Sequence, residues 1–530
     1  MLVLIADSCF NAVDGAPAVI YQREGGAIET VTYGELDRLS NRFANTLLGR
    51  GLARGDAIAI AMPMTVEAVA AYLGIVKAGC VVVSIADSFA AREIATRLRI
   101  ASAKIVVTQD VVARGGKTLP MYEKVTSAPA GPVIVVPAGR TPAVPLRDGD
   151  VEWDRFLSPV DCFDSVPCAP DDPTNILFSS GTTGDPKAIP WTQTTPVKCA
   201  SDGHLHHDIK PGEVVAWPTN IGWMMGPWLI YATLINRAAM ALYCGSPVTR
   251  GFCRFVQDAG VQMLGVVPSL VRAWQKNDAP RGLDWTAIKA FSSTGESSNP
   301  DDYLYLMSLA GYRPVIEYCG GTEIGGGYIS GTIVQPASPS TFSTPAFGLD
   351  FCILDEDGLP SENGELFLIP PSIGLSNRLL NRDHHAVYYA DTPTGPHGEL
   401  LRRHGDQFEA LPGGYYRGHG RADDTMNLGG IKVSSKEIER TLDAVEGVTE
   451  TAAIAYDPPE GGPSRLVVYA VSEPGARREV EPLKRKMQRA IAEELNPLFK
   501  IYDVVLTDEL PRTASNKVMR RVLREHYTTH

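Results

Sequence analysis

The N-terminal part of the chain alternates between two hydrophobic periods. Residues 33–48 and 66–77 carry apolar side chains at helical spacing, whereas 57–61, 81–85 and 105–108 are short runs rich in Ala, Val and Ile. Helical spacing over several turns is typical of a helix, and a short apolar run is typical of a buried strand. Strands that alternate with helices predict a largely parallel sheet with helices on its faces.

The alternation pauses and then resumes. Residues 129–145 are rich in Pro, Gly and Ala, which predicts a surface connection. Between 174 and 320 strand-like runs return, at 214–216, 240–243 and 263–266. We therefore expect the layered α/β structure to continue through this part of the chain.

The pattern changes again after residue 340. Short β-prone runs such as 351–354 and 365–369 are separated by Gly, Pro and Asp turns, which predicts a small β-rich subdomain. From Arg421 onward, helical and strand-like segments alternate once more; the expected helices are 434–445 and 481–495, and the expected strands are 451–455 and 466–470.

These changes predict an α/β fold with a domain boundary near residue 422. The first domain, 1–422, combines layered α/β subdomains with the small β-rich subdomain, and the second, 423–530, is a small α+β domain. A length of 530 residues exceeds what one hydrophobic core usually covers, which favours two or more domains.

Charge and cysteine usage narrow the class of protein. The formal net charge of −12 argues against nucleic acid as a partner, because phosphate backbones attract basic surfaces. The nine cysteines are odd in number and scattered, which predicts reduced thiols in an intracellular compartment.

One uncharged stretch, 214–236, is long enough to cross a membrane. Its prolines and glycines, Pro218 and Pro227 among them, favour a buried strand, turn and helix instead, so we expect no transmembrane segment. The N-terminus lacks the basic start of a signal peptide, and the tail 527–530 lacks a peroxisomal Ser-Lys-Leu ending. The prediction is a cytoplasmic or organellar protein, with the peroxisome left open.

The segment 178–190 reads FSSGTTGDPKAIP and follows a strand-like run at 175–178. Glycines let a backbone close around a polyanion, hydroxyl groups donate to its oxygens and a lysine adds positive charge. The segment is not a Walker loop, because Pro186 precedes the lysine, and taken alone a loop of this composition is more often only a connection. The predicted phosphate-binding residues are Ser179, Ser180, Gly181, Thr182, Thr183, Gly184 and Lys187.

Other chemistries have little support. The sequence contains no HExxH, paired CxxC or GxSxG motif, which argues against zinc hydrolases, zinc ribbons and α/β-hydrolases. The cluster His204, His206 and His207 could suggest a metal site, but a solvent-exposed loop is the favoured interpretation.

A series of motifs in fixed order resembles the adenylate-forming superfamily, which includes acyl-CoA synthetases, luciferases and peptide-synthetase adenylation domains. The resemblance extends over nearly the whole chain and is nearest to the acetyl-CoA-synthetase-like branch with its plant acyl-activating enzymes. The segment before Thr32 is short for that branch, which indicates a missing N-terminal extension. Besides the phosphate loop, the motifs lie at 32–36, 77–79, 293–296, 318–323, 364–366, 404–406, 420–424, 429–432 and 511–517.

The resemblance implies a reaction in which a carboxylate attacks the α-phosphorus of ATP, so that two anions must approach each other. It assigns Lys517 to contact the carboxylate and the α-phosphate, Thr322 to donate to the α-phosphate, and Glu323 to hold Mg²⁺. Without the family pattern, Lys517 would belong to a solvent-exposed basic tail with Arg520, Arg521 and Arg524.

The resemblance also implies the residues that hold the nucleotide. Asp406 would accept the ribose hydroxyls, with Arg421 helping to hold the nucleotide, although an Asp after His-Gly is more often a turn residue. The backbone at Gly295 and Glu296 would lie along the adenine, and Glu317 would reach its amino group; Lys432, where relatives often have arginine, completes the predicted nucleotide site.

In this superfamily the C-terminal domain rotates between two half-reactions. The hinge residue matches Asp423, and rotation would withdraw Lys517 and bring Gly429, Gly430 and Ile431 beside the tunnel that admits coenzyme A. Small residues suit a strip past which a thin ligand must move. The implied cofactors are therefore ATP, Mg²⁺ and coenzyme A.

The resemblance places the acyl pocket at Trp223, Met224, Met225, Thr294 and Gly320. Acetate-using relatives carry a tryptophan where Gly320 stands, so we expect an acyl group longer than acetate. Cys319 is the main departure from the family pattern, because an aromatic residue usually stacks on adenine at that position.

The predicted function is an ATP-dependent acid:CoA ligase that forms an acyl-adenylate and then an acyl-CoA, releasing AMP and pyrophosphate. One alternative loads the acyl group onto a carrier protein. Another is a catalytically silent paralogue, which Cys319 favours and which Lys187, Glu323, Asp406, Arg421 and Lys517 oppose.

Overall fold

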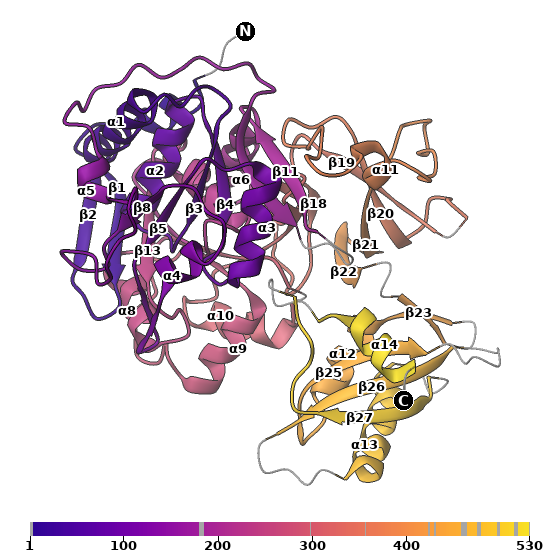
Figure 1. Cartoon of the computed structure of the whole chain (residues 1–530). Helices are drawn as coiled ribbons and strands as arrows, with labels where there is room; N and C mark the ends of the chain where they lie inside the picture. Colours follow the sequence, from indigo (N-terminus) through magenta and orange to yellow (C-terminus); the bar gives the residue numbers. More distant parts are fainter. Residues whose placement is uncertain are drawn as a thin grey trace. The chain divides into compact units, whose positions relative to one another are not determined.

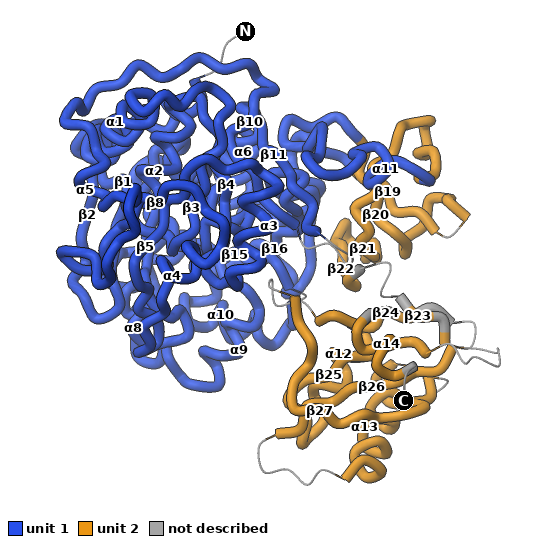
Figure 2. Tube along the Cα trace, viewed as in Figure 1, with its two compact units in different colours: residues 1–350, 370–391 blue, residues 351–369, 392–530 orange. Residues whose placement is uncertain are grey.

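The computed structural model describes residues 4–179, 185–296, 298–355, 357–421, 425–428, 431–456, 464–473, 479–495, 499–513 and 518–528 (Figure 1). The chain divides into two compact units (Figure 2). Unit 1 comprises residues 1–350 and 370–391, and unit 2 comprises 351–369 and 392–530. The predicted boundary at residue 422 rests on pattern alone and stays a prediction.

The first sheet of unit 1 is parallel except at one edge, where a hairpin closes it. In spatial order its strands are β11 (Lys187–Thr192), β10 (Pro173–Ser179), β4 (Val81–Ile85), β3 (Ala57–Ala61), β5 (Ile105–Gln109), β8 (Val133–Val136) and β9 (Val151–Glu152). The antiparallel pair is β10 and β11, so the predicted phosphate loop connects the two strands of the edge hairpin.

Both faces of this sheet are covered because its strand residues are apolar on both sides. Along β3, Ile58 and Ile60 enter a core with α1 (Tyr33–Gly49) and α2 (Val66–Lys77). Ala59 faces the opposite core, which is completed by α3 (Ala91–Ala101) and α4 (Met121–Thr126). The predicted helices at 33–48 and 66–77 and the predicted strands at 57–61, 81–85 and 105–108 are confirmed.

The second sheet of unit 1 is parallel at its centre and antiparallel at both ends. In spatial order its strands are β18 (Thr344–Pro345), β17 (Gly326–Ser330), β16 (Val315–Gly321), β15 (Ala290–Ser293), β14 (Met263–Val266), β12 (Val214–Ala216), β13 (Ala239–Cys244), β1 (Pro17–Arg23) and β2 (Ile28–Thr32).

The two sheets share a central core. That core contains α1, α2, α6 (Thr195–Leu205) and α7 (Met225–Leu234), together with apolar residues from both sheets. The outer face of the second sheet packs on α8 (Arg250–Asp258), α9 (Pro268–Asn277) and α10 (Pro300–Ser308), which lie together in the lower part of unit 1 in Figure 1. The uncharged stretch 214–236 forms β12 and α7, and no helix in the described ranges has the length and hydropathy of a membrane span.

The first two family-like motifs stabilise this packing. Thr32 and Glu35 form a capping box at the start of α1, and the hydroxyl of Tyr33 donates to the carbonyl oxygen of Ala238 at 2.8 Å. The buried ammonium of Lys77 donates to Asp37 at 2.5 Å and to Asn41 at 2.6 Å, which ties α2 to α1. These motifs therefore serve the fold of unit 1.

The prediction of a surface connection over residues 129–145 is wrong at its centre. Residues 133–136 form β8, a fully buried strand between β5 and β9. The Pro, Gly and Ala residues on either side dominate the composition, but four consecutive Val and Ile residues favour a strand more strongly than those neighbours disfavour one.

Unit 2 contains two separate sheets and a hairpin. The first sheet runs β19 (Asp350–Leu354), β20 (Asn363–Ile369), β21 (Arg402–Leu411) and β22 (Tyr415–Arg421), as the predicted β-rich subdomain requires. The hairpin pairs β23 (Thr425–Leu428) with β24 (Ile431–Ser434). The second sheet runs β25 (Val448–Tyr456), β26 (Arg465–Ser472) and β27 (Ile501–Thr507).

Helices cover both faces of the second sheet of unit 2. Along β26, Val468 packs with α12 (Ser435–Asp443) and α13 (Val480–Glu494), whereas Val467 packs with α14 (Arg520–Thr528). The helices and strands expected after Arg421 are confirmed. The remaining elements are η1 (Asp7–Phe10), β6 (Val112–Arg114), β7 (Lys117–Leu119) and α5 (Trp153–Phe156), with α11 (His384–Tyr388) in the part of unit 1 that follows residue 370.

Candidate active site

The edge hairpin of unit 1 presents the two ends of the predicted phosphate loop. Ser179 ends β10, Lys187 begins β11, and the two residues face each other in register. The hydroxyl oxygen of Ser179 is buried and has no hydrogen-bond partner in the described part of the chain. A hydroxyl in this state can donate to a ligand oxygen. The predicted loop residues Ser180, Gly181, Thr182, Thr183 and Gly184 lie outside the described residues.

Lys187 and Glu323, both predicted from the sequence, are brought together by the fold. The Lys187 ammonium lies 3.8 Å from a carboxylate oxygen of Glu323, and their side chains are 19% and 12% exposed. The same ammonium lies 3.4 Å from the hydroxyl oxygen of Tyr388 and 4.9 Å from the centroid of its ring. A cation and a carboxylate that keep partial access to solvent are suited to a phosphate and a divalent cation, respectively.

Two hydrogen bonds, one from a side chain and one from the backbone, hold the segment that follows β16. The indole nitrogen of Trp191, on β11, donates to the carbonyl oxygen of Thr322 at 2.7 Å. The backbone nitrogen of Ser376 donates to the carbonyl oxygen of Glu323 at 2.8 Å. Trp191 is not among the residues that the motifs predict; its one signal in the sequence is a tryptophan in an apolar strand, whose buried N–H needs an acceptor.

Gly320 is fixed by a close approach of two backbones. The pairing of β16 with β17 shifts register at this point, and a Cβ on Gly320 would lie 1.9 Å from the carbonyl oxygen of Gly326. A side chain of any size therefore requires the hairpin to move. The backbone at Gly320 therefore leaves no room for the tryptophan that acetate-using relatives carry at this position.

The other predicted pocket residues come from two different cores. Trp223 packs on Phe89, with 5.4 Å between ring centroids, while Met225 is buried and Met224 is partly buried in the shared core between the sheets. Thr294 follows β15 directly. The assignment of these residues to an acyl pocket stays a prediction.

The predicted adenine segment begins with a left-handed glycine. Gly295 has a φ of +91°, a conformation that glycine adopts without strain. The carboxylate of Glu296 accepts hydrogen bonds from the backbone nitrogen and the hydroxyl of Ser269, at 2.9 and 2.8 Å, at the start of α9. Glu296 therefore anchors the segment through its side chain, and the predicted contact of its backbone with adenine stays a prediction.

Glu317 is buried on β16. One carboxylate oxygen accepts a hydrogen bond from the hydroxyl of Ser298, and the other accepts one from the hydroxyl of Tyr303. Burial raises the pKa of Glu317 to about 7, and these two hydrogen bonds oppose the rise. The predicted contact of Glu317 with the adenine amino group stays a prediction.

The expectation of a solvent-exposed loop at His204, His206 and His207 is wrong for two of the three histidines. His206 and His207 are fully buried, whereas His204 is exposed. Burial lowers the pKa of His207 to about 4, so its ring is neutral at neutral pH. In the described ranges no group of His, Cys, Asp and Glu side chains is arranged to hold a metal ion. The local sequence is polar and α6 ends in the exposed residues His204 and Leu205, but the two histidines that follow the helix are buried.

A buried ion pair on α6 contacts β16. Lys198 donates to Asp202 at 2.6 Å, and both side chains are 1% exposed. The other carboxylate oxygen of Asp202 accepts hydrogen bonds from the hydroxyl of Tyr318 at 2.6 Å and from the backbone nitrogen of Gly327 at 2.9 Å. The pair therefore joins β16 to β17 just before the predicted catalytic residues.

The predicted ribose ligand lies in unit 2. Asp406, on β21, pairs in register with Arg421 on β22, and one of its carboxylate oxygens lies 3.4 Å from a ring nitrogen of His404. Lys432 and Ile431 belong to β24, but the side chains of Arg421, Ile431 and Lys432 are outside what the structure describes. The predicted hinge residue Asp423 and the predicted tunnel residues Gly429 and Gly430 also lie outside the described residues.

Lys517 lies outside the described residues too, but both flanks of its loop are described. Arg512 and Val518 form an antiparallel bridge, and the backbone nitrogen of Met519 donates to the carbonyl oxygen of Pro511 at 2.8 Å. The interpretation of a solvent-exposed basic tail is wrong for Arg520, which is buried and contacts both carboxylate oxygens of Glu439 at 2.7 and 2.8 Å.

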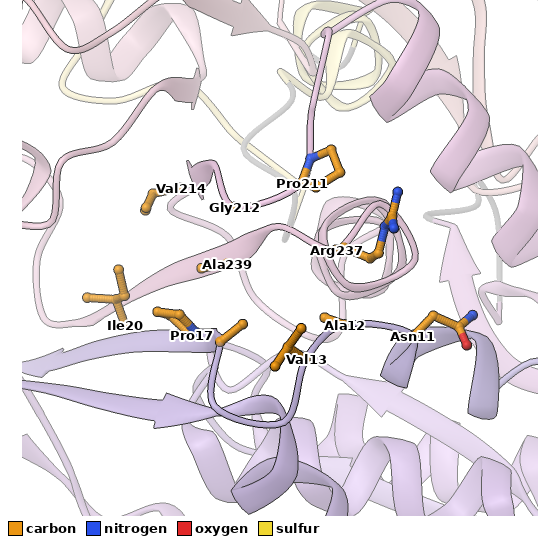
Figure 3. A pocket seen from close by; sticks show the side chains of 11 residues that line it. Asn11, Ala12, Val13, Pro17, Ile20, Pro211, Gly212, Val214, Arg237 and Ala239 are labelled. Atoms are coloured by element: carbon orange, nitrogen blue, oxygen red, sulfur yellow. The ribbon is translucent and has the colours of Figure 1, made fainter.

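A separate pocket of about 270 Å³ occurs elsewhere in unit 1 (Figure 3). Its lining includes one charged side chain, Arg237, and no carboxylate, histidine or thiol. It contains none of the residues predicted from the motifs. The lining residues are Asn11, Ala12, Val13, Ala16, Pro17, Ile20, Pro211, Gly212, Val214, Arg237 and Ala239.

Two family models match the chain. The model described as AMP-binding enzyme matches residues 8–374, and the model described as AMP-binding enzyme C-terminal domain matches residues 437–517.

Individual proteins match over nearly the whole chain. The probable acyl-activating enzyme 17, peroxisomal, of Arabidopsis thaliana is 53% identical over 528 residues, covering 96% of this chain and 73% of that protein. The hexanoyl-CoA synthase of Cannabis sativa is 50% identical over 527 residues, with the same coverage of 96% and 73%. The structure of the acetoacetyl-CoA synthetase from Streptomyces lividans superimposes with a TM-score of 0.89 at 26% identity, covering 98% of this chain and 81% of that one.

Proposed function

The chain belongs to the AMP-binding enzyme family, and from this premise we propose that it activates a carboxylic acid longer than acetate with ATP and transfers the acyl group to coenzyme A. The enzyme class is an AMP-forming acyl-CoA synthetase, an acid–thiol ligase. The names of two similar proteins, a hexanoyl-CoA synthase and an acetoacetyl-CoA synthetase, support an acyl group longer than acetate. Gly320, where no side chain fits, supports it independently.

The observation that carries the proposal is the pairing of Lys187 with Glu323 beside the unpartnered hydroxyl of Ser179. The chemistry needs positive charge near the departing pyrophosphate, and Lys187 is placed at the end of the phosphate loop to provide it. Glu323 is the carboxylate that would hold Mg²⁺, which, when bound, offsets charge on phosphate oxygens. The positive charge of Lys187 suits pyrophosphate, and the negative charge of Glu323 suits Mg²⁺.

We assign the remaining roles from the sequence. Asp406 and Arg421 hold the ribose side of the nucleotide, Thr322 donates to the α-phosphate and Lys517 neutralises the reacting carboxylate and the α-phosphate. The strip Gly429–Gly430–Ile431 admits coenzyme A in the second half-reaction, after rotation of the C-terminal domain about Asp423.

A peroxisomal location is part of the proposal. It is supported by the name of the Arabidopsis acyl-activating enzyme, a protein that is 53% identical to this chain.

The proposal predicts pyrophosphate release that depends on acid length. Each additional methylene that enters an apolar pocket contributes about 0.8 kcal/mol, so hexanoate, with four more methylenes, should exceed acetate in kcat/KM by roughly two-hundredfold. The measurement is pyrophosphate release over straight-chain acids of increasing length, with coenzyme A present or absent. Absence of release with every acid would refute the ligase function, and release without formation of an acyl-CoA would favour the carrier-protein alternative.

Replacement of Gly430 by leucine is expected to impair mainly the second half-reaction. A branched side chain in the strip would obstruct the thiol, lowering acyl-CoA formation by roughly tenfold or more, while acyl-adenylate formation stays within about twofold. The two steps are measured separately, by pyrophosphate release and by thioester formation from supplied acyl-adenylate. Gly139→Leu is the control, because a Cβ on Gly139 meets nothing within 4 Å. Equal loss of both steps would contradict the assignment of the strip.

A further inference from the structure

Residues 370–391 belong to unit 1, although the segments before and after them in the sequence belong to unit 2. This return segment, coloured as part of unit 1 in Figure 2, lies between 351–369 and 392–530 in the sequence, both of which belong to unit 2. Its contacts converge on the start of β11, the strand that begins with Lys187. We propose that Asn381 and Tyr388 of the return segment are positioning residues that fix the Lys187 ammonium for the pyrophosphate portion of ATP. The inference rests on the proposed function.

Asn381 holds the backbone on both sides of Lys187. Its side-chain nitrogen donates to the carbonyl oxygen of Pro186 at 2.9 Å, and its side-chain oxygen accepts from the backbone nitrogen of Ala188 at 3.0 Å. The backbone nitrogen of Leu380 donates to the carbonyl oxygen of Ala188 at 3.1 Å. Only an amide side chain supplies a donor and an acceptor side by side in this way, so aspartate cannot replace Asn381 without leaving an acceptor unpaired.

The end of the phosphate loop is restrained as well. A guanidinium nitrogen of Arg382 donates to the carbonyl oxygen of Asp185 at 2.7 Å. Arg99, on α3, donates to the carboxylate of the same aspartate at 2.7 Å. The backbone at Asp185, Pro186 and Ala188 is therefore held by the return segment, Lys187 is paired with Ser179 across the hairpin, and the Lys187 side chain contacts Tyr388.

Tyr388 provides a surface for the ammonium. Its side chain is buried at the end of α11, with the ring 4.9 Å from the Lys187 ammonium and the hydroxyl oxygen 3.4 Å from it. The ring of His384 packs against it at 5.1 Å, and Asp383 caps the helix by accepting a hydrogen bond from Ala386 at 2.8 Å. An aromatic face attracts a cation without neutralising its charge. Tyr388 can therefore orient Lys187 and leave its charge available to phosphate oxygens.

Separate affinities for pyrophosphate and AMP test this inference, because AMP lacks the phosphates that Lys187 serves. Titration calorimetry of the full chain with inorganic pyrophosphate, and with AMP, measures both without turnover. Tyr388→Leu is expected to weaken pyrophosphate binding by roughly tenfold and to leave AMP binding within about twofold. Tyr388→Phe, which keeps the aromatic face, should restore most of the pyrophosphate affinity, and Asn381→Asp should lower it as Tyr388→Leu does.

Tyr389→Leu is the matched control, because that neighbouring ring stacks on His385 at 5.7 Å. It should leave the affinities for both ligands unchanged. Equal weakening of AMP and pyrophosphate by Tyr388→Leu would show a general structural role and overturn the inference. Unchanged pyrophosphate binding in both Tyr388→Leu and Asn381→Asp would overturn the positioning inference and leave the proposed function standing. A wild-type chain that binds neither pyrophosphate nor AMP would refute the proposed function and the inference together.

Discussion

Replacement of Lys517 by alanine is expected to lower the rate of acyl-adenylate formation by roughly a thousandfold. Two anions, the substrate carboxylate and the α-phosphate, must approach each other in this step, and in the proposed function Lys517 supplies the positive charge between them. Thioester formation from a supplied acyl-adenylate should stay within about twofold, because the second half-reaction does not use this ammonium. Pyrophosphate release and thioester formation, assayed separately, measure the two steps.

The control for this variant is Lys500→Ala, which removes an exposed lysine in the same C-terminal region. It should leave both half-reactions unchanged. Loss of both steps to the same degree in Lys517→Ala, with native hydrogen exchange in β25–β27, would contradict the rotating-domain assignment. A Lys517→Ala enzyme that still releases pyrophosphate at the wild-type rate would contradict the catalytic role itself.

Replacement of Arg520 by methionine is expected to destabilise the second sheet of unit 2 by about 3 kcal/mol. Arg520 and Glu439 form a buried ion pair, with side chains 5% and 3% exposed. Removal of the guanidinium leaves the carboxylate buried, and among the described residues its remaining charged partner is the partly exposed Lys436, at 2.9 Å. The double variant Glu439→Gln/Arg520→Met should recover part of the loss, because it also removes the buried charge.

Two probes separate the units in this experiment. All seven tryptophans lie in unit 1, so tryptophan fluorescence reports unfolding of unit 1 alone, while hydrogen exchange of β25–β27 reports unit 2. Arg520→Met should speed hydrogen exchange in β25–β27 and leave unfolding measured by tryptophan fluorescence unchanged. Lys486→Met, which breaks an exposed pair with Glu446, should cost at most about 0.5 kcal/mol. A loss no larger than that in Arg520→Met would show that the buried pair contributes little.

Local hydrophobic periodicity was sufficient for most of the fold. The helix at 33–48 and the strand at 57–61 were predicted nearly to their ends, because their period is complete within a few residues. The buried strand 133–136 was missed because turn-forming neighbours dominated the composition of its surroundings. His206 and His207 were misassigned because burial between two sheets leaves no mark on a short polar segment.

The sequence by itself determined the order of the motifs, the types of chemical group in the site and the alternation of strands and helices. Each of these depends only on residue types and their spacing within short stretches of the chain. It could not determine that Lys187 faces Glu323, that Asn381 and Tyr388 bracket that lysine, or that Gly326 closes on Gly320. Those contacts join residues that are mostly far apart in sequence and depend on how sheets, helices and the return segment pack, so only the tertiary structure decided them.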